Sequence, residues 1–210
     1  MSDFKDLLGS VLPEVKGCPK SVAIREIRNS AIELCKYAPI WIDQIVDIET
    51  DIDDAQVELD SLVPDGAVIH KIISLTCDGR ELTPEVLSTF HRFDSRYTAP
   101  SRPMVYVSPV PNLVMVSPVP DDVYELRAAV SLTPTAIAGS ISDDIFNVWG
   151  GAMVNGALHR LMRFDSTPWG NAQMSSFYGG LFLQDKNQAR KSSVTAHSVM
   201  NRTVHPVSFI

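Results

Sequence analysis

The sequence predicts an α+β fold, in which a discontinuous helical bundle carries an inserted β-sandwich or barrel-like domain and an extended C-terminal tail. Three observations favour this class. Residues 1–38 and 136–191 contain helical spacings of apolar residues, residues 39–135 consist of short β-rich segments between turn residues, and residues 192–210 show no period. With 210 residues, of which 45% are hydrophobic, the chain is long enough to bury a core of its own.

The first helical part centres on an amphipathic helix over residues 19–38. Pro19 suits the first helical position, where its missing N–H costs nothing, and Pro39 ends the helix. A shorter helix is predicted over residues 2–9. The apolar face of the longer helix follows the 3,4 spacing of Ile24, Ile27, Ala31, Leu34 and Ala38.

The middle part is predicted to be β-rich. The dipeptide Asp78-Gly79 closes a long apolar run and is typical of a tight hairpin turn. One short helix is expected over residues 84–92, with Thr83 as its cap and Pro84 at its first position. Strands are expected over residues 40–48, 55–60, 67–76, 104–108, 113–117 and 123–132.

The second helical part should contain two helices, one from the cap Ser142 to about residue 164 and one from Thr167 to about Arg190. The first is apolar on almost every side and includes three glycines, which are unfavourable within a helix. Either these helices pack within the chain, or one face meets a neighbouring subunit. The candidate interface residues are Trp149, Gly150, Gly151, Gly156, Phe177 and Tyr178.

The C-terminal tail differs in charge from the rest of the chain. Residues 186–210 include Lys and Arg but no Asp or Glu, whereas the whole chain has a net charge of −7. The tail is therefore expected to dock onto an acidic partner through polar and apolar anchors, the alternative being a frayed end. The anchors are Arg202, Val204, His205, Pro206, Phe209 and Ile210.

Composition and motifs argue against several other functions. A net charge of −7 excludes a general nucleic-acid-coating role and a polybasic membrane anchor. Three widely spaced cysteines fit buried thiols in a protein made in the cytoplasm, and no catalytic or cofactor motif is present.

Residues 43–65 contain nine acids and no Lys or Arg, which predicts either a solvated strand edge or a metal site at Asp51, Asp53 and Asp54. We expect no cofactor, no bound metal and no enzymatic activity.

Several short segments, taken in order, resemble one known family. They are Leu12-Pro-Glu-Val15, Gly17-Cys-Pro19, Ile27–Glu33 and Trp41, then the Cys77–Leu82 hairpin, then Gly156–Leu158, Arg160-Leu161 and Pro168-Trp169, and finally a proline-containing tail. Together they resemble the head-to-tail adaptor, or connector, proteins of tailed bacteriophages, especially short-tailed ones. The tail of this chain has fewer arginines than the tails of that family.

The resemblance implies a structural virion protein at the head-tail junction. Its subunits would form a ring, typically a dodecamer, under the portal protein, with the C-terminal segments reaching onto the portal and the opposite face receiving the tail nozzle or tail tube protein. Double-stranded DNA would pass through the channel without sequence-specific binding, which an acidic lumen favours. The alternatives are a decoration or completion factor of the capsid or tail and, less favoured, a metal-dependent hydrolase.

Overall fold

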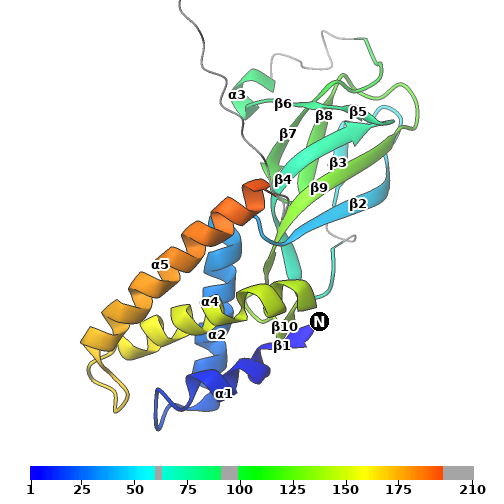
Figure 1. Ribbon diagram of the computed structural model, residues 1–210. Coiled ribbons are helices and arrows are strands. Elements are labelled where there is room, and N and C mark those ends of the chain that lie inside the picture. Colours follow the sequence, from blue (N-terminus) through cyan, green and yellow to red (C-terminus); the bar gives the residue numbers. More distant parts are fainter. Residues whose placement is uncertain (60–62, 91–98, 196–210) are drawn as a thin grey trace, which may run out of the picture.

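The computed structural model describes residues 1–59, 63–90 and 99–195. It confirms the α+β class, because long helices and several mostly antiparallel sheets occur in the same chain. Figure 1 shows the long helices gathered at one end of the molecule and most of the strands at the other. The helical segments flank the strands in sequence, as predicted, while the division into separately folding domains stays a prediction.

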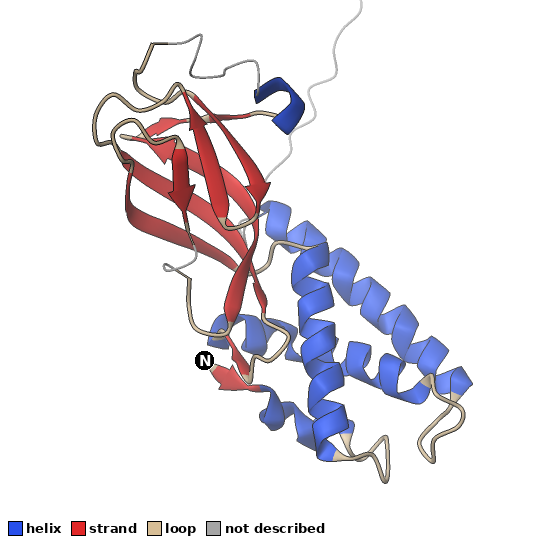
Figure 2. Cartoon of the chain, turned by 180° about the vertical axis from the view of Figure 1, so that it is seen from behind, coloured by secondary structure: helices blue, strands red, loops and turns tan. Residues whose placement is uncertain are grey.

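Three long helices form the helical end: α2 (Lys20–Tyr37), α4 (Asp143–Met162) and α5 (Ala172–Thr195). Helix α2 passes behind α4 in Figure 1, and it lies in front in the reverse view of Figure 2. The buried side of α2 includes Ile27, Ala31 and Leu34 of the predicted face, while Ile24 is half-buried. Pro19 lies one position earlier than predicted, as the N-cap residue with an extended backbone.

The N-terminal segment differs from the single helix expected over residues 2–9. Ser2 and Asp3 form a short strand, β1 (Ser2–Asp3), which pairs with β10 (Ser140–Ile141). A 3₁₀ helix, η1 (Phe4–Leu7), and a single turn, α1 (Leu8–Val11), follow. The helical conformation starts late because the Asp3 carboxylate accepts the backbone N–H of Lys5 and so acts as an N-cap.

The β-rich end contains two four-stranded sheets. The first has the order β2-β9-β4-β5 and is antiparallel throughout, and the second has the order β3-β8-β7-β6 and ends in a parallel pair. Between β4 and β5, Asp78 and Gly79 both have positive φ, as the predicted tight turn requires. The strands of the first sheet are β2 (Ile42–Glu49), β9 (Glu125–Pro134), β4 (Ala67–Cys77) and β5 (Arg80–Glu81); those of the second are β3 (Gln56–Glu58), β8 (Leu113–Ser117), β7 (Val105–Val110) and β6 (Thr83–Pro84).

The helix predicted over residues 84–92 is largely wrong. Thr83 and Pro84 belong to β6, and the only helical residues described in this range form the single turn α3 (Leu87–Phe90). The backbone N–H groups of Thr83 and Glu85 donate to carbonyl groups of residues 104 and 106, so pairing with β7 overrides the local capping signal. The end of the predicted helix, residues 91–92, lies outside the described residues.

The last helix begins and ends later than predicted. Residues 167–170 form turns, in which the Thr167 hydroxyl and N–H both donate to the carbonyl group of Phe164. Asn171 then acts as the cap, since its side-chain oxygen accepts the N–H of Met174, and α5 continues to Thr195. One continuous core of buried apolar residues extends from the helices into the sheets, which fixes both ends relative to each other.

Candidate functional site

Three of the predicted interface residues are buried within the chain. Trp149 is only 7% exposed, and a Cβ atom on Gly150 would touch a side chain of the N-terminal segment. A Cβ atom on Gly156 would lie 2.7 Å from the Ser30 hydroxyl oxygen on α2 and 3.0 Å from the Phe182 ring on α5. Glycine at 156 therefore allows the three helices to approach closely, and intrachain packing accounts for Trp149, Gly150 and Gly156.

The other predicted interface residues lie nearer the surface. Phe177 is 56% exposed on α5, and its ring makes an edge-to-face contact with the half-buried Tyr178. Gly151 is exposed on α4, with open space where a Cβ atom would lie. Val148 on α4 and Leu183 on α5 are exposed as well. Contact between these positions and a neighbouring subunit stays a prediction.

A charged cluster ties the three long helices together. Glu33 of α2 accepts hydrogen bonds from Arg160 of α4, at 2.5 Å, and from Lys186 of α5, at 2.7 Å. The ammonium group of Lys186 also lies over the rings of Tyr37 and Phe182. Burial alone would raise the pKa of Glu33, but the hydrogen bonds and positive charges of Lys186 and Arg160 outweigh it, so the pKa is lowered.

A second polar contact fixes α5 against α4. The Ser175 hydroxyl donates to the carbonyl oxygen of His159, at 2.8 Å, and the His159 Nδ1 atom lies 2.8 Å from the carbonyl oxygen of Ser175. A Cβ atom on Gly179 would lie 2.7 Å from that ring nitrogen, so the ring is enclosed between the helices. These contacts pack His159 between α4 and α5.

A concave feature lies where helices and strands meet. It is a groove of about 730 Å³ between the start of β2, the first two turns of α4 and the end of α5. More than half of its lining residues are apolar, and Asp43 and Asp144 also line it. Its principal lining residues are Ile40, Ile42, Ile145, Val148 and Trp149, with Ser192 and Ser193 on the α5 side.

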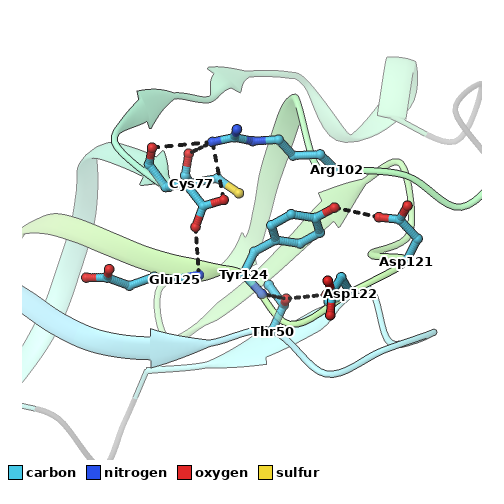
Figure 3. Close-up of polar contacts among 8 residues, drawn as sticks. Thr50, Cys77, Arg102, Asp121, Asp122, Tyr124 and Glu125 are labelled. Atoms are coloured by element: carbon cyan, nitrogen blue, oxygen red, sulfur yellow. Dashed lines mark hydrogen bonds and ion pairs between the residues drawn. The ribbon is translucent and has the colours of Figure 1, made fainter.

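A polar cluster closes the loops at the opposite end of β2, β4 and β9 (Figure 3). Arg102 donates to the carbonyl oxygens of Cys77 and Asp78 and lies 3.6 Å from the Asp78 carboxylate. The same carboxylate accepts the N–H of Glu125, which begins β9. The β4–β5 hairpin, the strand β9 and the segment before β7 are therefore held in one arrangement.

The neighbouring loops are linked by a hydroxyl group and a phenol (Figure 3). Thr50 accepts the N–H of Tyr124 at 2.9 Å, and its own hydroxyl donates to the carbonyl oxygen of Asp122. The phenol of Tyr124 donates to the Asp121 carboxylate at 2.6 Å, which raises the pKa of Tyr124 to about 12. This network stabilises loops and has no group poised for catalysis.

The acidic stretch does not form a metal site in the described part of the chain. Asp51, Asp53 and Asp54 lie in the exposed loop after β2, and the Asp54 carboxylate accepts the N–H of Gln56. Across residues 1–59, 63–90 and 99–195, no three His, Cys, Asp or Glu side chains are placed to hold a metal ion. The exposure of these aspartates fits a solvated strand edge and loop.

The cysteines are not placed for catalysis. Cys18, Cys35 and Cys77 are all buried and free. Burial raises the pKa of each thiol, for Cys35 to about 12, so the reactive thiolate is disfavoured. The backbone N–H of Ala23, in the helix that follows Cys18, lowers the pKa of the Cys18 thiol, but burial outweighs this effect.

The tail anchors Arg202, Val204, His205, Pro206, Phe209 and Ile210 lie outside the described residues, so portal binding by the tail stays a prediction. Sequence reasoning missed the groove, because its walls come from three segments that are distant in sequence. The apolar tripeptide Ile40-Trp41-Ile42 directly after Pro39 was the available signal, since it begins a strand at the end of a helix. No helix of the described chain combines the length and the apolar character that crossing a membrane requires.

The polar contacts described above hold helices and loops in place. A family model, described as the SU10 adaptor protein, matches residues 2–204 of the chain. The chain therefore belongs to the SU10 adaptor protein family, a family of structural phage adaptors. Membership in this family implies that the protein is a component of the virion and associates with portal and tail proteins. No curated protein matches the sequence.

Proposed function

We propose that this protein is the head-to-tail adaptor subunit of a short-tailed phage. Its copies form a ring, typically a dodecamer, under the portal, and the ring extends the DNA channel and provides the platform for the tail. The observation that carries the proposal is the family match over residues 2–204. The match continues past the end of α5 at Thr195, so it includes part of the C-terminal segment.

The structure supports a role of the folded chain as a scaffold that positions its own C-terminal segment. Helix α5 ends at Thr195 beside the groove, and its middle is fixed to α2 and α4 through Lys186 and Glu33. A helix held in this way gives the following segment a defined starting point. A segment with a defined start loses less conformational entropy when it binds a partner.

Charge supports passage of DNA without retention. Each chain contributes a net charge of −7, so a ring of identical chains has a strongly acidic surface. Phosphate groups are held by Lys and Arg through release of counterions, and an acidic channel offers few such contacts. Double-stranded DNA would therefore slide through the ring.

The test is binding to purified portal rings, followed by electron microscopy of the product. Full-length protein should add a ring of density to one face of the portal. A variant without residues 196–210 retains all of α5, so it should keep its helical circular dichroism and lose at least tenfold in portal affinity. Normal binding by the truncated protein would contradict the role of the tail.

Point variants refine this test. Alanine at both Phe209 and Ile210 should weaken portal binding, because these residues are the proposed apolar anchors. Alanine at the adjacent Ser208 is the matched control and should bind normally. The competing function, a decoration or completion factor, predicts a trimer or another small assembly without portal affinity, which a mass measurement on the portal mixture distinguishes.

A further inference from the structure

An isoleucine is displayed at the surface between β9 and β10. Ile137 is 88% exposed, the largest exposure of any large hydrophobic side chain described. Its neighbours Ala136 and Ala138 offer their carbonyl oxygens to the guanidinium group of Arg28 on α2, at 2.8 and 2.6 Å. Ala138 itself is buried, so the loop is fixed on both sides of the exposed side chain. We refer to Ile137 and this loop, residues 135–139, as the Ile137 loop.

An exposed apolar side chain on a fixed loop is well suited to bind a partner. A binding loop that is already held in its bound conformation loses little entropy on association. Arg28 supplies that rigidity from a position 108 to 110 residues away in the sequence. The Ile137 loop therefore has the character of a preformed anchor.

The groove described above offers a matching acceptor on another side of the molecule. Its walls come from α4, α5 and β2, and α2 contributes none of its principal lining residues. The Ile137 loop, in contrast, is bound to α2. Figures 1 and 2 show α4 and α2 on opposite sides of the helical end, so the loop and the groove belong to opposite flanks.

The two flanks also have opposite charge. Arg28 contacts the Ile137 loop, and Arg25, whose guanidinium pairs with the largely buried Glu26, lies three residues earlier on the same side of α2. The groove has Asp43 and Asp144 among its lining residues. A basic flank with an apolar anchor and an acidic flank with an apolar groove are complementary, as a head-to-tail contact between identical chains requires.

We propose that the Ile137 loop of one subunit inserts into the groove of the next, with Ile137 packed against Ile40, Ile42 and Val148 of that neighbour. The occupant of the groove is thus a second copy of this chain. The contact is heterologous, and its repetition closes a ring. This inference rests on the proposed ring and specifies which surfaces form it.

Cysteine cross-linking in the assembled portal complex tests the contact directly. The three native cysteines are buried, so cysteines introduced at exposed positions are the reactive ones. The double variant I137C/V148C, treated with a short bismaleimide reagent, should give a ladder of covalent multimers on a denaturing gel. Either single variant alone should stay monomeric, because a heterologous contact needs both surfaces.

The outcomes separate this inference from the proposed function. A ring seen by electron microscopy without a ladder of multimers overturns the inference and leaves the adaptor function standing. Covalent dimers from I137C alone indicate a two-fold contact and also overturn it. Absence of any ring on the portal overturns both proposals.

A second test introduces a charge at position 137 and measures ring formation on the portal. Ile137→Asp should reduce the ring fraction on the portal at least tenfold without changing the unfolding temperature, since this side chain is almost fully exposed. The matched control is Val123→Asp, because Val123 is exposed in the loop before β9, at the end of the sheet far from the helices. Equal ring formation by Ile137→Asp and the wild-type protein would contradict the proposed contact.

Discussion

Replacing Glu33 by Gln tests whether the charged cluster holds the helical end together. Glutamine keeps the size of the side chain and removes its charge. The Arg160 and Lys186 cations, which bond to Glu33 at 2.5 and 2.7 Å, would then lose their counterion. The Lys186 side chain is only 16% exposed, so water compensates little for the loss.

The expected destabilisation is moderate because the cluster is partly solvated. Exposed ion pairs contribute up to about 1 kcal/mol, and breaking a fully buried pair costs about 3–5 kcal/mol. The carboxylate of Glu33 is 37% exposed, which places it between these cases and nearer the first. We expect the free energy of unfolding to fall by about 1–2 kcal/mol, which lowers Tm by roughly 2–8 °C for a chain of this length.

The stabilisation by Glu33 depends on pH, and the lowered pKa of Glu33 determines the direction of that dependence. The pKa of Glu33 is lowered in the folded state, so its ionised form stabilises that state. This stabilisation is fully present above the pKa of an unfolded glutamate, about 4.3, and disappears as pH falls through the folded pKa. The difference in unfolding free energy between wild-type and Glu33→Gln should therefore be constant near neutral pH and shrink in acid.

Urea denaturation at a series of pH values measures this difference. Glu58→Gln is the matched control, because Glu58 is an exposed residue on β3, and it should change stability little at any pH. Equal stability of wild-type and Glu33→Gln at neutral pH would refute the role of the cluster. A difference that persists undiminished in acid would show that shape, and not charge, is responsible.

Three further predictions concern stability and are measured by the same denaturation assay. Gly156→Ala should destabilise the protein by about 1–3 kcal/mol, because its Cβ atom would overlap Ser30, whereas Gly151→Ala, which has open space, should stabilise α4 by up to about 1 kcal/mol. Thr133→Val should stabilise by about 1 kcal/mol, because the buried Thr133 hydroxyl has no hydrogen-bond partner within the described chain; a loss of stability would indicate a partner there. Gly79→Ala should cost about 1 kcal/mol, since φ at Gly79 is +75°, and an unchanged midpoint would show that the turn relaxes.

Local sequence patterns were sufficient to predict most of the helices and strands. The strands expected over residues 67–76 and 113–117 match β4 and β8 to within one residue, and Asp78-Gly79 predicted the turn in which both residues have positive φ. The exceptions are positions where pairing with a strand distant in sequence overrides the local preference. Pro84 shows this, since a good first helical residue became part of β6 through parallel pairing with Tyr106.

The candidate sites were harder to predict, because they are built from distant segments. The groove combines residues near positions 40, 145 and 192, and the Ile137 loop depends on Arg28. Composition showed that α4 has more apolar surface than one helix face can bury, but it did not show which residues the chain covers by itself. Only the three-dimensional arrangement separates Gly156, which packs internally, from Gly151, which faces solvent.

This division explains the unusual composition of α4. One side, including Met153, Ala157 and Leu161, is buried by the chain itself. Val148 remains 58% exposed in a groove with Trp149, where a further apolar side chain could be accommodated. Fully burying a side chain such as Ile137 or Val148 contributes about 1.5–3 kcal/mol, which is weak for a single contact. In the proposed closed ring every subunit would both give and receive this contact, so interfaces that are weak individually would become sufficient when the ring is complete.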